Sequence, residues 1–562
     1  MELSGAQIMA KCLELEGTKH IFGFPGGAIM PFYDALMDSK IRHYLVRHEQ
    51  GAAHAADGYA RTSDKAGVCV ATSGPGATNL VTGLATALMD CSPVVAITGQ
   101  VACPVIGTDA FQEIDVFGIT LPATKHGYLV KDVRDLARAF KEAFHIALSG
   151  RPGPVVIDVP KDVQNQKTEF VYPDEVNLPG YHPEEAEEVD EEAVARACEL
   201  VERAERPVLI CGGGVVYSNA TPELTAFVEK IDCPVAATLH GLSALPTAHP
   251  LALGMLGMHG SGYANNAVLK ADLIINFGSR FDDRITGNLK TFAENAKVIH
   301  VDIDPSEIDK NVRADVGIVG DAKILLERFR ESVTEKKRPE WLARIERWRK
   351  QYPKKVLDEK DGVNPMTILE CISERGTDDV IVTTDVGQHQ MWSAQLLRQG
   401  RPRYFVTSGG LGTMGFGLPA AVGAQVANPD KLVIAITGDG SIQMNIQELA
   451  TVSTNKIPVK IVLMENKYLG MVRQWQEHFF DKRYSCTHLE GNPDFVKLAS
   501  AYGIAGARVE RNADVPAAIK KCLEHDGPYL LHMVIPEETN VYPLVPSGAP
   551  FTEAIGLEDA VR

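Results

Sequence analysis

The sequence predicts an α/β fold made of three doubly wound parallel-sheet domains. Short apolar runs alternate with glycine-rich turns and helical segments, beginning at His20–Phe24, which Pro25-Gly26-Gly27-Ala28 follows. Strands and helices that alternate in this way build a parallel sheet with helices on both faces. The length of 562 residues provides about three or four domains of ordinary size, each able to bury its own core.

The composition restricts the kind of protein and its partners. Hydrophobic residues make up 45% of the chain and charged residues 23%, which is typical of a soluble globular protein. A net charge of −17 argues against a nucleic-acid partner, because neutralising phosphates takes clustered Lys and Arg. The ten cysteines include no Cys-x-x-Cys pair, which predicts reduced thiols and a cytoplasmic protein. We expect no signal peptide and no membrane partner, because the first residues lack a basic segment and Asp90 and Pro93 interrupt the most apolar stretch, Leu80–Gly99.

The first domain is expected at residues 1–165. Each of its strands ends at a polar or glycine-rich turn, and ligands bind beyond the carboxyl ends of the strands in such sheets. These turns are therefore the expected binding edge. The strands are expected at His20–Phe24, Tyr44–Val46, Val68–Thr72 and Val94–Thr98.

Two more domains are expected, at residues 190–325 and 365–540. A linker rich in proline and acidic residues separates the first two domains at about 164–190. The charged segment 331–364, around Trp341 and Trp348, predicts a helix lying on the surface and then a linker. Residues 541–562 form a tail too rich in proline for regular structure. The expected strands are Pro207–Cys211, Val235–Leu239, Leu273–Phe277, Val298–Asp302, Val380–Thr384, Leu432–Ile436, Val459–Met464 and Leu530–Val534.

Asp439 and Asn466 follow two strands that a helix joins, so both should lie at the same edge of the sheet. Carboxylate and amide oxygens are ligands that Mg²⁺ accepts, with positions left over for phosphate oxygens. Gly438 and Gly440 allow the backbone to approach a bulky anion. The pattern predicts a metal-bound diphosphate, although Asp between two glycines is also an ordinary way to end a strand.

The spacing of this motif points to a cofactor. Gly438-Asp439-Gly440 is separated from Asn466 by 25 residues, Ser441 to Glu465, which resembles the motif of thiamine-diphosphate enzymes. That family usually has two adjacent asparagines, and here Glu465 takes the place of the first. Glu49, in Arg47-His48-Glu49-Gln50-Gly51-Ala52, resembles the glutamate that bonds N1′ of the aminopyrimidine in this family and so starts the proton relay that forms the ylid. The alternative for Glu49 is an acid placed for the helix dipole, worth under about 1 kcal/mol.

Further motifs resemble one branch of that family over nearly the whole chain, the catalytic subunits of acetohydroxyacid synthase, also called acetolactate synthase. Each motif is weak alone, and their order and joint presence are specific. They include Pro25–Ala28, Ser73–Asn79, Gly107–Glu113, Ser149–Pro154, Arg280–Arg284, Asp385–Gln390, Gly412–Gly417 and Gly470–Trp475.

The resemblance implies how thiamine diphosphate and Mg²⁺ are held. Asp439, Asn466 and the backbone oxygen of Tyr468 would bind the metal. Met414 would support the V-shaped cofactor, the alternative being plain core packing. The other residues implied in cofactor binding are Glu49, Val386, Gly387, Gln388, His389, Gln390, Gly440, Ser441 and Gly470.

The resemblance also implies a substrate site. Gly27 would offer its backbone N–H near the developing intermediate, and Phe111, Gln112 and Lys161 would line the pocket for the second substrate. Glu49, Gly27, Gln112 and Lys161 are the implied catalytic residues. Met471 and Trp475 lie four apart, on one face if the segment is helical, and the resemblance associates the Trp with a preference for 2-ketobutyrate. Core packing is the alternative for this pair.

A second cofactor, FAD in a non-redox role, is implied for the central domain. The turn Cys211-Gly212-Gly213-Gly214 follows a strand but lacks the full dinucleotide fingerprint. Asp302 and Asp321 could equally form strand-end turns, and the Arg280–Arg284 run is the better discriminator, since flavin-free catabolic synthases generally lack it. The implied FAD residues are Arg151, Gly212, Gly213, Gly214, Thr238, Leu239, His259, Gly278, Arg280, Asp302 and Asp321.

The function implied is decarboxylation of pyruvate on thiamine diphosphate, followed by condensation of the hydroxyethyl carbanion with a second 2-keto acid. The products would be 2-acetolactate from pyruvate and 2-aceto-2-hydroxybutyrate from 2-ketobutyrate, which enter valine, leucine and isoleucine synthesis. Each cofactor would lie between two subunits, so at least a homodimer is implied, together with a small regulatory subunit. The alternatives are a flavin-dependent pyruvate oxidase, a 2-keto acid decarboxylase, and a non-catalytic protein of the same fold.

Overall fold

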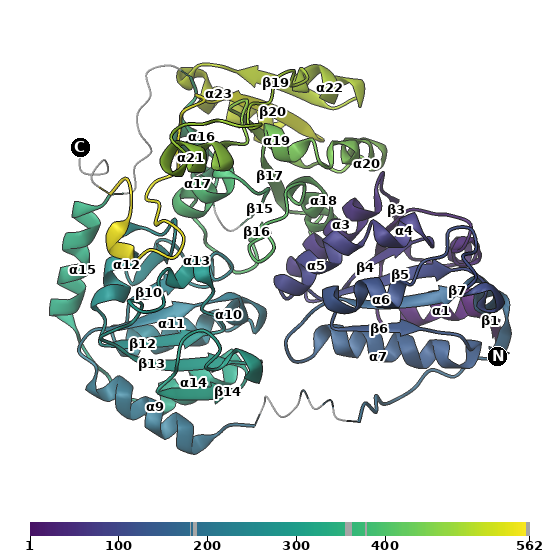
Figure 1. Cartoon of the computed structure of the whole chain (residues 1–562), viewed down its shortest axis with the longest axis horizontal. Helices are drawn as coiled ribbons and strands as arrows, with labels where there is room; N and C mark the ends of the chain where they lie inside the picture. The colour runs from purple at the N-terminus through teal and green to yellow at the C-terminus, as the bar shows by residue number, and fades with distance from the viewer. Residues whose placement is uncertain (180, 182, 184–187, 354–361, 377–378, 558–562) are drawn as a thin grey trace.

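The computed structural model describes residues 1–179, 181, 183, 188–353, 362–376 and 379–557. Three six-stranded parallel sheets follow one another along the chain, each with helices on both faces (Figure 1). The predicted fold class is confirmed. The acidic run at 184–187, part of the second linker at 354–361 and the last residues of the tail, 558–562, lie outside the described residues.

The first sheet has the order β3-β2-β4-β5-β7-β6, and all its pairings are parallel. A short antiparallel pair, β1 with β8, ties the start of the chain to the end of this unit. The elements are β1 (Glu2–Ser4), α1 (Gly5–Leu15), β2 (His20–Gly23), β3 (Arg42–Leu45), α3 (Glu49–Arg61), β4 (Gly67–Ala71), α5 (Val81–Met89), β5 (Val94–Gln100), β6 (His126–Leu129), α7 (Leu136–Leu148), β7 (Val155–Pro160), α8 (Lys161–Asn165) and β8 (Lys167–Glu169).

The central sheet has the order β11-β10-β9-β12-β13-β14. The elements are α9 (Glu191–Arg203), β9 (Pro207–Cys211), α11 (Thr221–Lys230), β10 (Val235–Ala237), β11 (Ala252–Met255), α12 (Gly262–Lys270), β12 (Leu273–Phe277), β13 (Lys297–Asp302), β14 (Val316–Val319) and α14 (Ala322–Ser332).

The third sheet has the order β16-β15-β17-β18-β20-β19. The elements are α16 (Pro365–Glu374), β15 (Val380–Thr384), α17 (Gln388–Leu396), β16 (Phe405–Thr407), α18 (Gly417–Ala427), β17 (Leu432–Gly438), α19 (Asp439–Ile442), α20 (Leu449–Asn455), β18 (Lys460–Glu465), α21 (Gly470–Phe479), α22 (Phe495–Ala501), β19 (Ala505–Val509), α23 (Val515–Glu524) and β20 (Tyr529–Val534).

Every strand named from the sequence is present, with ends that differ by a few residues at most. The strands that the sequence did not reveal are mostly at sheet edges, such as β14 and β19. Edge strands expose part of their side chains, so they lack the continuous apolar run of a buried parallel strand. Strand β7 was also missed, although it is buried throughout, because Asp158 and Pro160 interrupt its apolar run.

The helix predicted on the surface between residues 331 and 364 is present, and one of its faces packs against the central domain. Helix α15 (Pro339–Gln351) contacts α12, and Trp341 is buried with its indole Nε1–H donating to the backbone oxygen of Pro207 at 3.0 Å. A buried indole N–H needs such a partner. The prediction of a surface helix is confirmed, and the structure adds that a narrow apolar stripe, Trp341 and Ile345, packs against the central domain.

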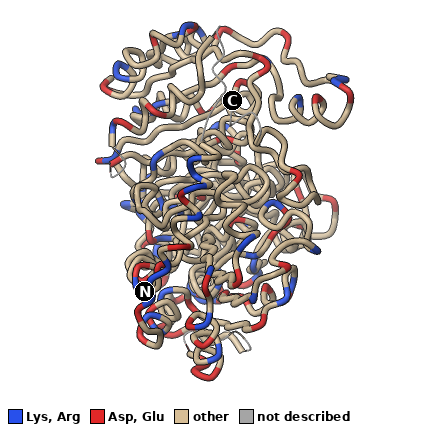
Figure 2. Tube along the Cα trace, turned by 90° about the vertical axis from the view of Figure 1, so that its left-hand side faces the viewer, with Lys and Arg blue, Asp and Glu red and all other residues tan. Residues whose placement is uncertain are grey.

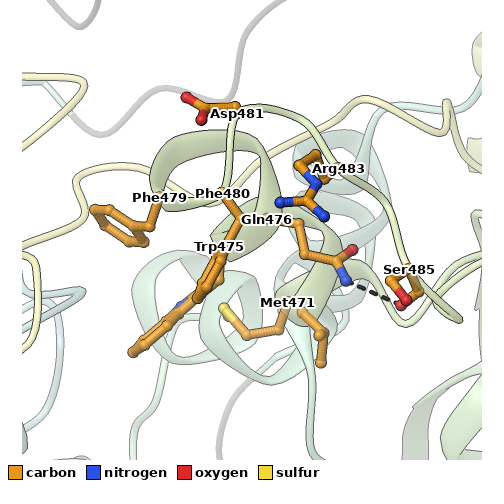
Figure 3. A pocket seen from close by; sticks show the side chains of 9 residues that line it. Met471, Trp475, Gln476, Phe479, Phe480, Asp481, Arg483 and Ser485 are labelled. Carbon is orange, nitrogen blue, oxygen red and sulfur yellow. Dashed lines mark hydrogen bonds between the residues drawn. The ribbon is translucent and has the colours of Figure 1, made fainter.

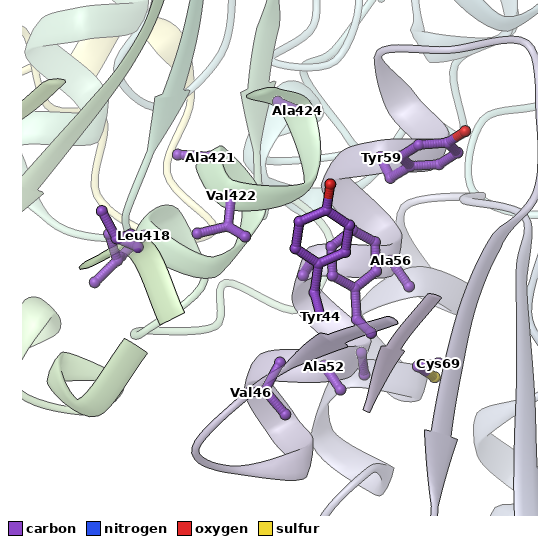
Figure 4. Packing of buried hydrophobic residues seen from close by; sticks show 14 of the residues in the cluster. Tyr44, Val46, Ala52, Ala56, Tyr59, Cys69, Leu418, Ala421, Val422 and Ala424 are labelled. Carbon is purple, nitrogen blue, oxygen red and sulfur yellow. The ribbon is translucent and has the colours of Figure 1, made fainter. Parts of the chain in front are cut away.

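Helices α3 and α18 hold the first and third sheets together within one chain. A Cβ atom on Gly58 would lie 2.1 Å from the backbone oxygen of Ala420, and one on Gly423 would lie 1.8 Å from that of Ala55. The two helices therefore touch backbone to backbone, which only glycine permits at these positions. Figure 4 shows the small apolar side chains of both helices in one continuous core.

Charged residues of both signs are spread over the surface. Figure 2 shows Lys and Arg interspersed with Asp and Glu rather than gathered into one basic face. Within the described residues, no helix has the length and apolar character needed to cross a membrane. The predicted domain boundaries, 1–165, 190–325, 365–540 and the tail 541–562, stay predictions.

Candidate active site

Asp439 and Asn466 lie at the same edge of the third sheet. Strands β17 and β18 pair in parallel with Gly438 opposite Met464, so the residues that follow these two strands are neighbours. Asp439 opens helix α19, and Asn466 comes directly after β18. The predicted convergence of a carboxylate and an amide is therefore found.

Hydrogen bonds fix both side chains. The Oδ2 atom of Asp439 accepts from the backbone N–H of Lys467 at 2.9 Å and from the side-chain amide of Asn492 at 2.8 Å. The amide of Asn466 donates to Oε1 of Gln388 at 3.1 Å, and its Oδ1 accepts from the N–H of Tyr468. Burial, and then the nearby charge of Glu465, raise the pKa of Asp439 to about 6. A cation beside this carboxylate would lower the pKa again.

A cavity of about 730 Å³ opens at this edge. Every residue of the third domain that was predicted to bind thiamine diphosphate, metal or substrate lines it: Val386, Gly387, Gln388, His389, Gln390, Met414, Asp439, Gly440, Ser441, Asn466, Tyr468, Gly470, Met471 and Trp475. Met414 is half-buried and faces the cavity, so plain core packing does not describe it. Gln390 lines the wall, with its side-chain amide held by Thr407 and Ser408.

The cavity suits an anionic ligand near His389. The Nε2 atom of this buried ring has no hydrogen-bond partner among the described residues, and burial lowers the pKa of the ring to about 3. A Cβ atom on Gly387 or Gly438 would lie 2.8 or 2.9 Å from the ring, so only glycine leaves room here. The neutral imidazole of His389 and the oxygen ligands offered by Asp439 and Asn466 form a set that fits a diphosphate with Mg²⁺.

A second cavity, of about 710 Å³, lies between the central domain and the end of the first. It shares Thr238 and Arg280 with the first cavity. Ser279 is among its lining residues, and the buried hydroxyl of this serine has no hydrogen-bond partner among the described residues, which suits a polar ligand. The predicted FAD residues that line it are Arg151, Gly213, Gly214, Thr238, Gly278, Arg280, Asp302 and Asp321, whereas Leu239 and His259 line the first cavity.

Three predicted FAD residues have structural roles as well. Gly212 lines neither cavity, and a Cβ atom there would lie 2.0 Å from the backbone oxygen of Gly278, so it serves the packing of two turns. Asp321 caps helix α14 by accepting from the N–H groups of Lys323 and Ile324. Asp302 accepts from the N–H of Asp304 while lining the cavity. The two interpretations of these aspartates are therefore compatible.

The predicted residues of the first domain form a separate group. Glu49 opens α3 with its Oε2 accepting from the side-chain amide of Asn79 at 2.9 Å. The glycine turn after β4 lies close to two of these residues. A Cβ atom on Gly76 would lie 3.4 Å from Oε1 of Glu49, and a Cβ atom on Gly74 would lie 2.8 Å from the backbone oxygen of Gln112. Gly27 and Lys161 are exposed at the same edge of the sheet, and Phe111 is 88% exposed. In the described part of the chain, none of these predicted residues lines either cavity.

Known proteins match both the parts and the whole of this chain. Three family models match in order: the N-terminal binding domain of thiamine pyrophosphate enzymes at residues 3–119, their central domain at 194–329 and their C-terminal binding domain at 385–533. Across 561 residues the chain is 50% identical to the acetolactate synthase isozyme 2 large subunit of Escherichia coli K12, covering 98% of this chain and 99% of that one. The chain belongs to the acetolactate synthase large-subunit family of thiamine pyrophosphate enzymes.

Two more members of the acetolactate synthase family match at similar levels. The probable large subunit of Methanocaldococcus jannaschii is 49% identical, with 98% of this chain and 95% of that one covered. The large subunit of Parasynechococcus marenigrum is 48% identical, with 99% and 91% covered. The resemblance stated from the motifs is confirmed, while the roles of single residues stay predictions.

In this member of the acetolactate synthase family, Met471 and Trp475 lie on α21 and line the cavity that also holds Asp439. Both also line an adjoining pocket of about 690 Å³ with Phe479 and Phe480, which Figure 3 shows from close by. Neither side chain is fully buried. Core packing alone therefore does not account for the pair.

Two further residues beside Asp439 and Asn466 were not predicted from the sequence. Asn492 bonds Asp439 directly, and Glu465 was noted only as a departure from the family motif. Asn492 stands in a loop 26 positions after Asn466 in a segment without periodicity, so no local signal reveals it. The only sequence feature that pointed to this cluster was Glu465 itself, which stands where the family motif usually has asparagine.

Proposed function

We propose that the chain is a catalytic subunit that decarboxylates pyruvate and joins the remaining two-carbon unit to a second 2-keto acid. Pyruvate as acceptor gives 2-acetolactate, and 2-ketobutyrate gives 2-aceto-2-hydroxybutyrate. The observation that carries the proposal is one cavity in which Asp439, Asn466, the His389 region and Met414 meet, in a chain of the acetolactate synthase family.

Thiamine diphosphate would supply the centre that stabilises the negative charge left when CO₂ departs. Asp439, Asn466 and the backbone oxygen of Tyr468 would hold Mg²⁺, and Gln388 and His389 would orient the diphosphate. Glu49 would hold a proton at N1′ of the aminopyrimidine. Met414 would contact the cofactor and so set its conformation.

FAD would occupy the second cavity and the part of the first near His259. Burial lowers the pKa of His259 to about 4, so its ring is neutral, and its Nδ1 lies 3.2 Å from the backbone oxygen of Pro543 in the tail. Two keto acids yield the product and CO₂ without net oxidation. The flavin would therefore be structural, which agrees with a non-redox role.

The acceptor would be chosen by the walls around it. Met471 and Trp475 from α21 would face the acceptor side chain, with Gly27, Phe111, Gln112 and Lys161 of another subunit opposite. An apolar wall of this kind separates substrates that differ by one methylene by about 1–3 kcal/mol. We infer a modest preference between pyruvate and 2-ketobutyrate rather than exclusion of one.

Product analysis tests the function. Purified protein would receive pyruvate and 2-ketobutyrate together, with and without thiamine diphosphate, Mg²⁺ and FAD. We expect both acetohydroxyacids, no peroxide, and loss of products when thiamine diphosphate or Mg²⁺ is omitted. Peroxide with flavin bleaching would indicate an oxidase, free aldehyde a decarboxylase, and the absence of turnover a non-catalytic protein.

We further propose that the active site forms between two copies of the chain. Glu49 lies in the first domain and outside the cavity that Asp439 lines, while α3 and α18 fix the two domains against each other within one chain. In a homodimer, the sheet edge that carries Glu49 in one copy would lie over the cavity that Asp439 lines in the other copy. The two-fold symmetry would give two such sites in each dimer. The printed name of the relatives, large subunit, supports a small regulatory partner in addition.

Mixing two inactive variants tests the shared site. Chains with Glu49→Gln and chains with Asp439→Asn should each be inactive, and an equal mixture, dissociated and reassembled, should regain about one quarter of the wild-type activity. Half of the reassembled dimers contain one chain of each variant. In each of these mixed dimers one of the two sites combines an unchanged Glu49 with an unchanged Asp439, so half of the dimers have half of the wild-type activity. A control mixture of Glu49→Gln with the double variant should stay inactive. Failure of the first mixture to recover would mean that each chain builds its own site.

We infer a cytoplasmic location from the ten cysteines, all of which are free.

A further inference from the structure

A second carboxylate lies behind the metal-ligand position. Glu465, the last residue of β18, is only 4% exposed. The side-chain amide of Asn492 donates to Oε1 of Glu465 at 3.2 Å and to Oδ2 of Asp439 at 2.8 Å. One amide group therefore bridges two buried acids, one of which faces the cofactor cavity.

The orientation of the Asn492 amide is determined by its surroundings. Its Oδ1 accepts from the side-chain amide of Gln443 at 3.1 Å, so its Nδ2 must face the two carboxylates. The same Gln443 amide donates to the backbone oxygen of Asp439. The loop that carries Asn492 is fixed to the metal site, since the N–H of Leu489 donates to the backbone oxygen of Lys467 at 2.8 Å.

Glu465 is held in place from the other side. Its Oε2 lies 2.9 Å from Nε2 of the buried His532 on β20, and Arg508 on β19 approaches to 3.9 Å. Strands β18, β20 and β19 are neighbours in the sheet, so the three side chains lie across adjacent strands. Glu465 is thus a carboxylate held in place behind Asp439 by side chains of two other strands.

We propose that Glu465 and Asn492 are positioning residues for the divalent cation at Asp439. Asn492 and the N–H of Lys467 both bond Oδ2 of Asp439 and so present Oδ1 to the cation. Glu465 holds Asn492 and adds a second negative charge near the site, which a cation compensates. This inference rests on the proposed metal site and explains what the residue in place of the usual asparagine does.

Binding of Mn²⁺ tests the pair directly. Full-length protein with thiamine diphosphate would be titrated with Mn²⁺, and free Mn²⁺ would be measured by electron paramagnetic resonance. We expect Glu465→Gln and Asn492→Ala each to weaken Mn²⁺ binding by about 10-fold or more. The double variant should lose little more than the weaker-binding single variant, because the two residues act together.

A matched control removes a charge of the same type nearby. Glu510 is exposed and bonds Arg508, and in the part of the chain that the structure describes it makes no hydrogen bond to Asn492. The Glu510→Gln variant should therefore bind Mn²⁺ as the wild type does. The melting temperature of each variant without cofactor separates a binding defect from unfolding. If Glu465→Gln does not fold, Asn492→Ala, on a half-buried loop, decides the question.

The outcomes separate two ideas. The positioning role would be wrong if Glu465→Gln and Asn492→Ala bound Mn²⁺ with wild-type affinity while Asp439→Asn bound none. The proposed metal site would still hold in that case, because the wild type would bind Mn²⁺ through Asp439. Wild-type protein that binds no Mn²⁺ in the presence of the coenzyme would overturn the metal site and the pair together.

Discussion

Replacing Glu49 with glutamine should reduce kcat by about 10²–10⁴-fold, the range for losing a positioned proton-transfer group. The amide keeps the size of the side chain, and Asn79 can rotate its own amide to keep the contact that it now makes at 2.9 Å. Folding should be unaffected. Steady-state product formation with saturating cofactors measures the effect.

A control for this variant is Glu142→Gln in α7. Glu142 is also a buried carboxylate of the first domain, bonded to Tyr128 and Arg138, but it lies away from the glycine turns. Its replacement should leave kcat close to the wild-type value. Equal activity of the two variants would contradict the role of Glu49, whereas loss of activity with a lowered melting temperature in Glu49→Gln would point to a structural role instead.

Replacing Arg61 with methionine should destabilise the packing of the three domains by about 3–5 kcal/mol, as expected when one partner of a buried ion pair is removed. Arg61 bonds Asp57 at 2.6 Å and Asp90 at 2.8 Å in the first domain, and its guanidinium donates to the backbone oxygen of Thr407 in the third. All three charged side chains are buried. Methionine would leave the buried carboxylate of Asp57 without its ion-pair partner and would remove one of the groups that hold Asp90.

Asp90 extends this cluster to the central domain. Its carboxylate lies 2.9 Å from Nε2 of His240 and accepts from the N–H groups of Gly409 and Gly410, which line the same cavity as Asp439. Burial alone would raise the pKa of Asp90, but His240 and Arg61 outweigh burial and hold it well below the usual range. Loss of Arg61 should therefore also loosen the loop that carries Gly409 and Gly410.

The measurements for Arg61→Met are the half-life of thermal inactivation and limited proteolysis, because a chain of several domains does not unfold in one step. Arg134→Met is the control. Arg134 pairs with Asp132 at the surface with 78% of its side chain exposed, and such pairs contribute about 1 kcal/mol or less. Indistinguishable half-lives for the two variants would show that the buried cluster does not hold the domains together.

The sequence predicted those parts of the fold and site that depend on local pattern. Buried strands such as Leu273–Phe277 were located to the residue because apolar residues run almost without interruption along them. The edge strands and the buried stripe of α15 were not predicted, because their apolar residues are few and diluted by charge. Asp439 and Asn466 were predicted to meet since parallel strands bring their carboxyl ends to one edge. The clusters at Asn492 and Arg61 join segments far apart in the chain, and nothing local signals them.

The tight backbone contact between α3 and α18 has a consequence for the behaviour of the protein on dilution. In the proposed homodimer each copy would carry two half-sites, the Glu49 edge and the Asp439 cavity, at a fixed separation. An isolated chain could then not bring its own two halves together. Coenzyme retention and turnover should then disappear together once the concentration falls below the dissociation constant of the assembly. Added thiamine diphosphate should in turn favour reassociation of the chains, because it would bind the assembled form and not the separate chains.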